Sequence, residues 1–265
     1  MKAIITGAAG GIGRSVALLA AASKQKDANL ILVDRDPVGL EATASQARAS
    51  GASVIALTAD LIDPESAPKI VESAAREFSG LDCVVSNAGV LRAGGLAEIS
   101  LETYELSFAV NTRPTWLLGK AAHKLLAASK GCIVATASIA GEHPAPFLST
   151  YSPSKAALVL LIRQMASEWG PDGVRCNCVS PGATDTGMTS GAYGDDGDPA
   201  RSENRRRREG FIPLRRIGKP EDVANAVLFL ASPAASLITG VNVHVDGGLS
   251  TALMPSAGGG TGYRS

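Results

Sequence analysis

The sequence predicts an α/β protein: a Rossmann-type, doubly wound parallel β-sheet of about seven strands with helices on both faces, forming a three-layer sandwich. Three observations lead to this fold class. Apolar runs of about five residues alternate with longer segments of helical period. These runs are continuously apolar, which is typical of parallel strands that are buried on both faces. A glycine-rich turn follows the first run directly.

Each expected strand is a short apolar run, and each expected helix is a longer stretch whose apolar residues recur at helical spacing. The first part of the chain is expected to hold, in order, the strand Lys2–Thr6, the helix Ile12–Ala22, the strand Leu30–Val33, the helix Val38–Ala49, the strand Ser53–Thr58, the helix Pro64–Phe78 and the strand Cys83–Ser86. The rest is expected to hold the helix Tyr104–Ser129, the strand Cys132–Thr136, the helix Ser152–Trp169, the strand Arg175–Val179, the helix Pro220–Ala231 and the strand Val241–Val245. Pro114 predicts a kink in the long helix, because proline removes a backbone donor.

The 265 residues suit one domain, expected over residues 1–255. Residues 184–218 interrupt the alternation with a polar, Gly-rich stretch that ends in a run of arginines, and long excursions of this kind are usually substrate lids. The arginines Arg205 to Arg208 favour a solvated helical face over an anion-binding site. The tail at 256–265 is rich in Gly, Ser and Thr, and we expect it to be flexible.

The composition excludes several classes of protein. Lys plus Arg balances Asp plus Glu at 25 each, so the chain has no bulk attraction for nucleic acid or anionic membranes. It contains no apolar run of membrane-spanning length and no secretory signal. The cysteines Cys83, Cys132, Cys176 and Cys178 lie in apolar runs without metal-ligand spacing, which indicates reduced thiols, a cytoplasmic location and no metal site.

The turn after the first strand has the pattern of a phosphate-binding loop. It reads Gly7-Ala-Ala-Gly10-Gly11-Ile12-Gly13 and leads into a helix, whose N-terminal N–H groups and dipole favour a pyrophosphate. Asp34 stands at the end of the second strand, where a carboxylate accepts hydrogen bonds from ribose hydroxyls and repels a 2′-phosphate. We therefore expect NAD as the cofactor and NADP as the less favoured one, although the neighbouring Arg35 could accommodate a phosphate or stack on adenine.

Tyr151 and Lys155 stand four residues apart at the start of an expected helix, so they share one face. A nearby ammonium favours the phenolate and lowers a tyrosine pKa, which prepares the phenol for acid–base work. Ser138 and Asn87-Ala88-Gly89 each follow the end of an expected strand. In a parallel sheet these ends face the ligand crevice, where a serine hydroxyl can donate to a substrate carbonyl.

These motifs occur together, and in this order the sequence resembles the short-chain dehydrogenase/reductases in their common single-domain branch. The resemblance covers about residues 2–249. The motifs that carry it are Thr6-Gly7-x-x-x-Gly11-Ile12-Gly13, Asp60-Leu61, Asn87-Ala88-Gly89, Val110-Asn111, Ser138, Tyr151-x-x-x-Lys155 and Pro181-Gly182.

The resemblance implies a role for each catalytic residue. Tyr151 would exchange a proton with the substrate oxygen, and Ser138 would hold and polarise that oxygen. Lys155 would lower the pKa of Tyr151 and bind the nicotinamide ribose, while Asn111 would hold a water that links Lys155 to solvent. Asp60 would contact the adenine, Asn87 would lie on the adenosine side, and the segment Pro181–Thr186 would fix the nicotinamide amide. The full set of expected cofactor residues is Gly7, Gly11, Ile12, Gly13, Asp34, Arg35, Asp60, Leu61, Asn87, Ala88, Gly89, Tyr151, Lys155, Pro181, Gly182, Ala183 and Thr186.

The expected activity is reversible hydride transfer between a secondary alcohol and its ketone. Candidate substrate residues are mostly apolar or aromatic, which suits a cyclic, aromatic or steroid-like alcohol; besides Ser138 they are Ile139, His143, Phe147, Met188, Tyr193 and Phe211. Two alternatives stay open: an NADP-dependent 3-ketoacyl thioester reductase, and an inactive, dinucleotide-sensing relative. The resemblance also implies a homotetramer, or a dimer, and two long helices with broad apolar faces agree with such pairing.

Overall fold

The computed structural model describes residues 1–23, 28–193 and 197–252, and its strands form one seven-stranded parallel sheet in the order β3-β2-β1-β4-β5-β6-β7. The strands are β1 Lys2–Thr6, β2 Asn29–Asp34, β3 Ser53–Thr58, β4 Cys83–Ser86, β5 Cys132–Thr136, β6 Arg175–Pro181 and β7 Asn242–Val245. The predicted doubly wound parallel sheet is confirmed. The strand order reverses between β1 and β4, and in such folds ligands bind in the crevice at this point.

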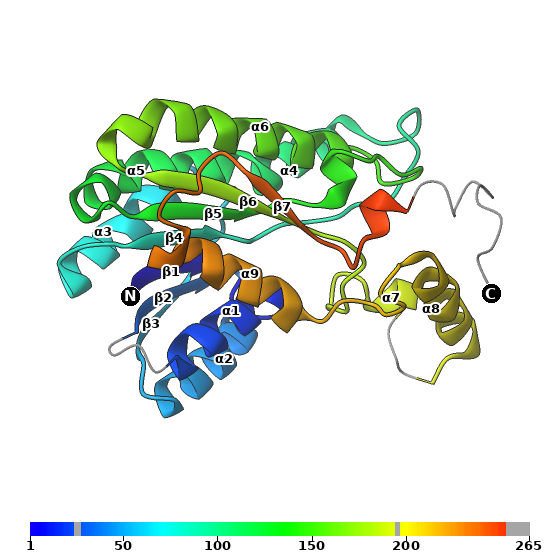
Figure 1. The fold of residues 1–265 in the computed structure, drawn as a ribbon, viewed down its shortest axis with the longest axis horizontal. Coiled ribbons are helices and arrows are strands. Elements are labelled where there is room, and N and C mark those ends of the chain that lie inside the picture. The colour runs from blue at the N-terminus through cyan, green and yellow to red at the C-terminus, as the bar shows by residue number, and fades with distance from the viewer. Residues whose placement is uncertain (24–27, 194–196, 253–265) are drawn as a thin grey trace.

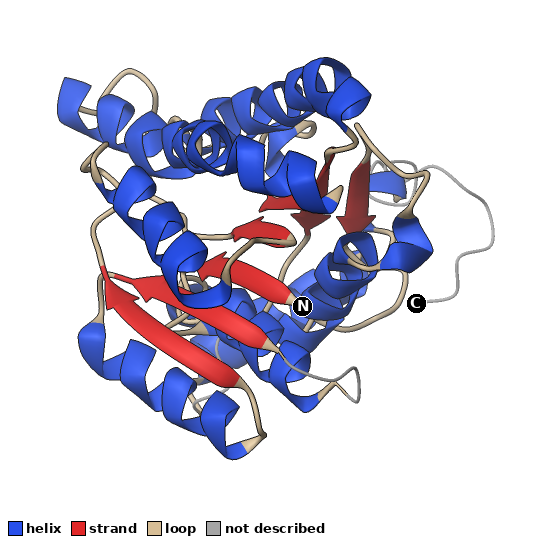
Figure 2. Cartoon of the chain, turned by 90° about the vertical axis from the view of Figure 1, so that its left-hand side faces the viewer, coloured by secondary structure: helices blue, strands red, loops and turns tan. Residues whose placement is uncertain are grey.

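The helices cover both faces of the sheet. They are α1 Gly11–Ala22, α2 Pro37–Ala49, α3 Ser66–Phe78, α4 Leu101–Asn111, α5 Arg113–Ser129, α6 Tyr151–Trp169, α7 Ser190–Tyr193, α8 Pro199–Phe211 and α9 Pro220–Ala231. Figure 1 shows α3, α4, α5 and α6 on one side of the sheet and α1, α2 and α9 on the other. Figure 2 shows the sheet enclosed between these two layers, so the architecture is a three-layer sandwich.

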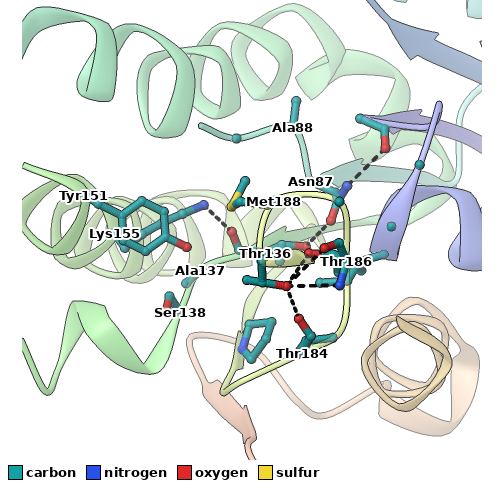
Figure 3. Close-up of a pocket in the computed structure, with 18 of the residues that line it drawn as sticks. Asn87, Ala88, Thr136, Ala137, Ser138, Tyr151, Lys155, Thr184, Thr186 and Met188 are labelled. Carbon is teal, nitrogen blue, oxygen red and sulfur yellow. Dashed lines mark hydrogen bonds between the residues drawn. The ribbon is translucent and has the colours of Figure 1, made fainter. Parts of the chain in front are cut away.

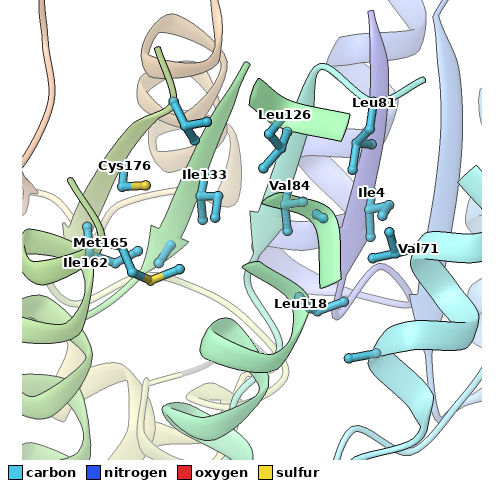
Figure 4. Packing of buried hydrophobic residues seen from close by; sticks show 14 of the residues in the cluster. Ile4, Val71, Leu81, Val84, Leu118, Leu126, Ile133, Ile162, Met165 and Cys176 are labelled. Atoms are coloured by element: carbon cyan, nitrogen blue, oxygen red, sulfur yellow. The ribbon is translucent and has the colours of Figure 1, made fainter. Parts of the chain in front are cut away.

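Each face of the sheet has its own hydrophobic core. Consecutive residues of β1 divide between the two: Ile4 packs with α3, α5 and α6, whereas Ile5 packs with α1, α2 and α9. Both side chains are completely buried. Figure 4 shows the first core, in which Ile4, Val84 and Ile133 from neighbouring strands face Leu118. Burial on both faces explains why the strands read as continuous apolar runs.

One expected helix is in fact two. The sequence predicts a kinked helix over Tyr104–Ser129, but α4 ends at Asn111 and α5 begins at Arg113, with Thr112 between them in a non-helical conformation. Pro114 lies in the first turn of α5. Its missing N–H and its ring are incompatible with a helical hydrogen bond to the carbonyl of Val110, so the helix breaks before it. The expectation of a single helix is therefore wrong.

The polar excursion at residues 184–218 is largely helical where the structure describes it, because α7 and α8 both lie within it. Asp198 caps α8, and Pro199 occupies its first turn. Figure 1 shows α7 and α8 at the same end of the sheet as the C-terminal ends of the strands, beyond β7. Residues 253–265, which contain the expected tail, lie outside the described part of the chain. The single-domain boundary at 255 stays a prediction.

The described residues contain no helix that is both long enough and apolar enough to cross a bilayer. All four cysteines are buried and free. Cys83 and Cys132 are paired in register on the neighbouring strands β4 and β5, where apolar packing surrounds them. The cysteines therefore contribute to the core as small apolar side chains.

Candidate active site

A cavity of 350 Å³ lies at the C-terminal ends of β1, β4, β5 and β6. It brings together most of the residues singled out in the sequence. Its lining includes Gly7, Gly11, Ile12, Asp34, Asn87, Ala88, Gly89, Ser138, Tyr151, Lys155, Pro181, Gly182, Thr186 and Met188. Figure 3 shows that Tyr151 and Lys155 from α6 and Ser138 from the end of β5 lie around the same space.

The glycine turn between β1 and α1 depends on backbone conformations that favour glycine. Gly7 and Gly11 have φ values of +67° and +51°. Gly13 is required for a different reason, because a Cβ atom there would lie 2.1 Å from the carbonyl oxygen of Gly7. Gly13 therefore allows α1 to pack closely on the turn and does not itself line the cavity.

Asn87 connects the ends of three strands by hydrogen bonds and lines the cavity. Its Nδ2 donates to the carbonyl of Thr6 over 3.1 Å, and its Oδ1 accepts from Thr136 Oγ1 over 3.0 Å. The Thr6 hydroxyl in turn accepts the backbone N–H groups of Asn87 and Ala88. These bonds join the ends of β1, β4 and β5. The resemblance implies that Asn87 lies on the adenosine side of a cofactor. In the structure its side chain is bonded to other parts of the protein and still lines the cavity.

Asp34 lies where the main cavity meets a second cavity of 110 Å³. Its Oδ2 accepts the N–H of Ala9 over 3.0 Å, and its Oδ1 accepts the N–H of Asp36 over 3.1 Å. The carboxylate therefore holds the glycine turn at the end of β2. Arg35, Asp60 and Leu61 line the second cavity.

Tyr151 and Lys155 occupy the first turns of α6 on one face. The ammonium of Lys155 lies 5.8 Å from the centre of the Tyr151 ring and donates to the carbonyl of Thr136 over 2.7 Å. Ser138 follows β5, and its Oγ accepts the N–H of Ala140 over 3.1 Å. An oxygen that accepts in this bond keeps its own hydrogen for donation, so Ser138 can donate to a ligand in the cavity.

Burial lowers the pKa of the Lys155 ammonium from an ordinary 10.5 to about 8. The side chain is only 3% exposed, so it loses most of the hydration that favours its charge. A lysine with this pKa exchanges its proton near neutral pH. Its neighbour Thr136 was not singled out by the sequence, because only the fold brings that carbonyl to the ammonium.

The buried Lys155 gives a testable dependence of stability on pH. Between about pH 8 and 10.5 the folded state holds fewer protons at this site than the unfolded state, so the free energy of unfolding rises with pH. We expect the unfolding free energy of the cofactor-free protein, relative to that of Lys155→Met, to rise by about 2 kcal/mol from pH 7.5 to pH 10. Urea unfolding of both proteins at the two pH values measures this difference. A difference that stays constant would contradict the lowered pKa.

Asn111 lies beside Lys155 but does not line the cavity. Its Oδ1 accepts the N–H of Val90 over 2.8 Å, and its Nδ2 donates to Ser154 Oγ over 3.0 Å. A Cβ atom on Gly89 would lie 3.2 Å from Asn111 Oδ1 and 3.5 Å from Lys155 Nζ, so the glycine leaves room between the two side chains. The carboxamide therefore joins α4 to α6 at the lysine.

The expected substrate residues are only partly brought together. Met188 lines the cavity, as does Ser138, whereas Ile139, His143, Phe147 and Phe211 do not. Phe147 and Phe211 are 72% and 46% exposed. Among the described residues of the expected substrate set, Met188 is therefore the apolar side chain that lines the cavity. The side chain of Tyr193 lies outside the described part of the structure.

Several lining residues were missed in the sequence because they are common polar or small residues without a motif. They are Thr136, Ala137, Thr184, Gly187 and Thr189. Their position at or after the ends of β5 and β6 was the available signal. Gly10, which belongs to the glycine turn singled out in the sequence, also lines the cavity. Ala183, which was expected to contact a cofactor, is not part of the lining; its carbonyl accepts the N–H of Gly218.

The arginine run lies on α8 and does not line the cavity. Arg205 forms ion pairs with Asp185 and Glu209, at 2.9 and 3.2 Å, and Arg206 pairs with Glu203 at 2.8 Å. This arrangement matches the interpretation as a helical face with local charge pairs. Among the described residues, no group of three or more His, Cys, Asp or Glu side chains is placed to hold a metal ion.

Comparison with known proteins agrees with this geometry. A family model described as Enoyl-(Acyl carrier protein) reductase matches residues 7–250. The chain is 36% identical over 250 residues to 2,3-dihydro-2,3-dihydroxybenzoate dehydrogenase of Bacillus subtilis, covering 93% of this chain and 94% of that protein. It is 32% identical over 249 residues to 3-oxoacyl-[acyl-carrier-protein] reductase of Synechocystis, covering 93% and 96%.

The fold has equally similar solved structures. A short-chain type dehydrogenase/reductase from Mycobacterium marinum superposes with a TM-score of 0.83 at 31% identity, covering 93% of this chain and 94% of that one. Residues 7–250, which the family model matches, include the glycine turn and the helix that carries Tyr151 and Lys155. The chain belongs to the short-chain dehydrogenase/reductase family and is an oxidoreductase that acts on alcohols or ketones.

Proposed function

We propose that the protein catalyses NAD-dependent, reversible hydride transfer between a secondary alcohol and its ketone. One observation carries the proposal: Tyr151, Lys155 and Ser138 line the same cavity as the glycine turn and Asp34. The chemical groups for proton exchange and the groups suited to a dinucleotide thus border one continuous space. The family uses NAD(P) cofactors, and the preference for NAD is our inference from Asp34.

The residues present fit a dinucleotide. The turn at Gly7 and Gly11 leaves backbone unobstructed at the N-terminus of α1, where N–H groups and the helix dipole favour a pyrophosphate. Asp34 would accept hydrogen bonds from the ribose hydroxyls, and Asp60 and Leu61 would border the adenine. Pro181, Gly182 and Thr186 also line the cavity and would hold the nicotinamide. When bound there, the nicotinamide supplies the hydride donor or acceptor.

The chain's own residues supply the proton chemistry. Tyr151 would give a proton to the carbonyl oxygen of a ketone, or take it from an alcohol. Lys155 stabilises the phenolate through its positive charge, and its pKa of about 8 lets it return the proton near neutral pH. Ser138 would donate its hydroxyl hydrogen to the same substrate oxygen and fix its position. Asn111 would hold the water through which Lys155 exchanges with solvent.

The nature of the substrate is supported less directly. Of the apolar side chains expected to contact the substrate, Met188 lines the cavity. Its position favours a substrate with an apolar portion next to the reacting carbon. The relative from Bacillus subtilis is named for 2,3-dihydro-2,3-dihydroxybenzoate, a ring-bearing alcohol. Both observations agree with a cyclic or aromatic secondary alcohol. A small-molecule substrate of this kind is the partner that we propose.

A second candidate is the reduction of a 3-ketoacyl thioester with NADP, which the similarity to the Synechocystis reductase favours. Asp34 opposes it, because a carboxylate at the ribose repels a 2′-phosphate. The complete Ser138, Tyr151 and Lys155 set opposes an inactive, dinucleotide-sensing role. Absorbance at 340 nm, with NADH or NADPH and a panel of cyclic ketones, aliphatic ketones and a 3-ketoacyl thioester, separates these functions. Turnover of the thioester alone would overturn the proposed substrate class, and no turnover of any compound would favour the sensing role.

Asp34→Ala should weaken NADH binding by roughly tenfold or more and narrow the preference over NADPH, because a charge-assisted hydrogen bond is lost and a phosphate is no longer repelled. Fluorescence titration with both cofactors measures the ratio. Asp34→Asn is the matched control, since it removes the charge and keeps one carbonyl oxygen that can accept from Ala9, while the acceptor for the N–H of Asp36 is lost. If the ratio is unchanged in both variants, Arg35 or another group determines the preference.

We also propose that the protein is cytoplasmic and forms a homotetramer. Trp116 on α5 and Leu160 on α6 are 43% and 66% exposed, which supports pairing of these helices with a second copy. Sedimentation analysis of the protein tests the assembly.

A further inference from the structure

His244 lies between two segments of the chain, one of which carries Ser138 of the cavity lining. Its Nε2 lies 2.9 Å from Glu142 Oε2, and its Nδ1 lies 3.0 Å from Ser250 Oγ. Glu142 is separated from it by about a hundred residues in sequence and belongs to the turn after β5. Ser250 follows β7. The imidazole uses both ring nitrogens in these contacts, so its position is fixed by both segments.

The first segment is the turn that carries Ser138. The Ser138 carbonyl accepts the N–H of Gly141, and Ser138 Oγ accepts the N–H of Ala140. The carbonyl of Ile139 accepts the N–H of Glu142. Glu142 is therefore the last residue of this hydrogen-bonded turn. Its carboxylate is bonded to β7, because Oε1 accepts from Asn242 Nδ2 over 2.8 Å.

The second segment contacts the end of the polar excursion at residues 184–218. The carbonyl of Gly247 accepts the N–H of Leu214, which follows α8. Leu249 packs against the buried side chains of Ile212 and Ile217. Asp246 accepts the N–H of Ser250 over 2.7 Å and so shapes the turn to which His244 is bonded. Through Ser250, the imidazole is therefore connected to the turn that contacts the end of this excursion.

We propose that Glu142 and His244 are positioning residues whose hydrogen-bonded contact holds the Ser138 turn against the C-terminal segment and strengthens substrate binding. The inference rests on the role proposed for Ser138. Neither side chain touches the reacting atoms; both lie outside the lining of the main cavity. Their effect is therefore expected on KM for the alcohol or ketone and not on the chemical step.

Several polar and charged groups surround the pair. The hydrogen bond from Asn242, and then the charge of His244, lower the pKa of the Glu142 carboxyl, with a smaller contribution from Arg163 on α6. Asp246 faces His244 from the end of β7, and the ring of His143 lies 6.3 Å from its ring. The lowered pKa favours the ionised carboxylate, which is the stronger acceptor for the imidazole and for Asn242.

Glu142→Gln and His244→Gln test the proposal. We expect KM for the alcohol or ketone to rise roughly threefold to tenfold in each variant, while kcat stays within about threefold of the wild type. His123→Asn is the matched control, because it removes another His–carboxylate pair, 3.0 Å from Asp172, at residues that do not line the cavity. It should leave KM unchanged.

Hydrogen–deuterium exchange gives a readout that does not depend on catalysis. The amides of Gly141, Glu142 and His143 should exchange faster in the Glu142 and His244 variants than in the wild type, with their melting temperatures checked for an intact fold. Unchanged exchange and unchanged KM would overturn the positioning role. Full activity of Ser138→Ala would instead overturn the proposed function, whatever the behaviour of Glu142 and His244.

Discussion

Replacement of Tyr151 by phenylalanine is expected to reduce kcat by at least about 100-fold and to leave the affinity for NADH nearly unchanged. Tyr151 is the phenol in the cavity whose ring lies beside a buried ammonium, and phenylalanine removes only its oxygen. The ring continues to cover Lys155, so α6 and the cofactor site keep their shape. The loss is therefore confined to proton transfer at the substrate oxygen.

Steady-state rates and fluorescence titration with NADH separate the two effects. Tyr104→Phe is the matched control: this tyrosine is 48% exposed on α4 and stacks on Phe108, so the same chemical change should leave kcat unaltered. Near-normal turnover in Tyr151→Phe would refute the acid–base assignment. A parallel loss of NADH binding would show that the ring hydroxyl also serves the cofactor site.

Gly13→Ala is expected to destabilise the protein by several kcal/mol, in the range of overpacked sites. A Cβ atom there would lie 2.1 Å from the carbonyl oxygen of Gly7 and 2.7 Å from Asn87 Nδ2. The nearest obstacle is backbone, so a change of rotamer cannot relieve the contact. The start of α1 must move away from β1, which also distorts the turn expected to hold the pyrophosphate.

Gly10→Ala is the matched control, because it measures the change in unfolding free energy when a glycine of the same turn is replaced without a clash. Nothing lies within 4 Å of a Cβ at Gly10, and its φ of −162° is ordinary extended backbone. We expect it to change the free energy of unfolding by less than about 1 kcal/mol in cofactor-free protein. Urea titrations of the two variants measure both values. Equal stabilities would mean that the turn can move at little cost.

The elements of the fold were predictable because they depend on local patterns. Every expected strand is present, since continuous apolar runs such as Lys2–Thr6 have few alternatives in a chain that must bury both faces of a sheet. The break at Thr112 was not predicted at its correct place. The sequence marks Pro114, but the bond from Thr112 Oγ1 to the carbonyl of Ser154 on α6 exists only in the folded protein.

The site was predictable to the extent that its residues follow strand ends in recognisable motifs, as Ser138 and Asn87 do. Phe147 and Phe211 were expected at the substrate because they are apolar and lie, respectively, after Ser138 and in the excursion at residues 184–218. Apolar character alone does not determine where a side chain points from a turn, as at Phe147, or from the last residue of a helix, as at Phe211. Both side chains are exposed, and neither lines the cavity.

The sequence by itself determined the parallel sheet, the glycine turn and the shared face of Tyr151 and Lys155, because strand burial and helical spacing are properties of neighbouring residues. Only the tertiary structure decided which distant groups meet. The carbonyl of Thr136 at the Lys155 ammonium, and Glu142 beside His244, are brought together by the order of strands in the sheet. Contacts of this kind depend on packing across the whole domain, and no local pattern in the chain encodes them.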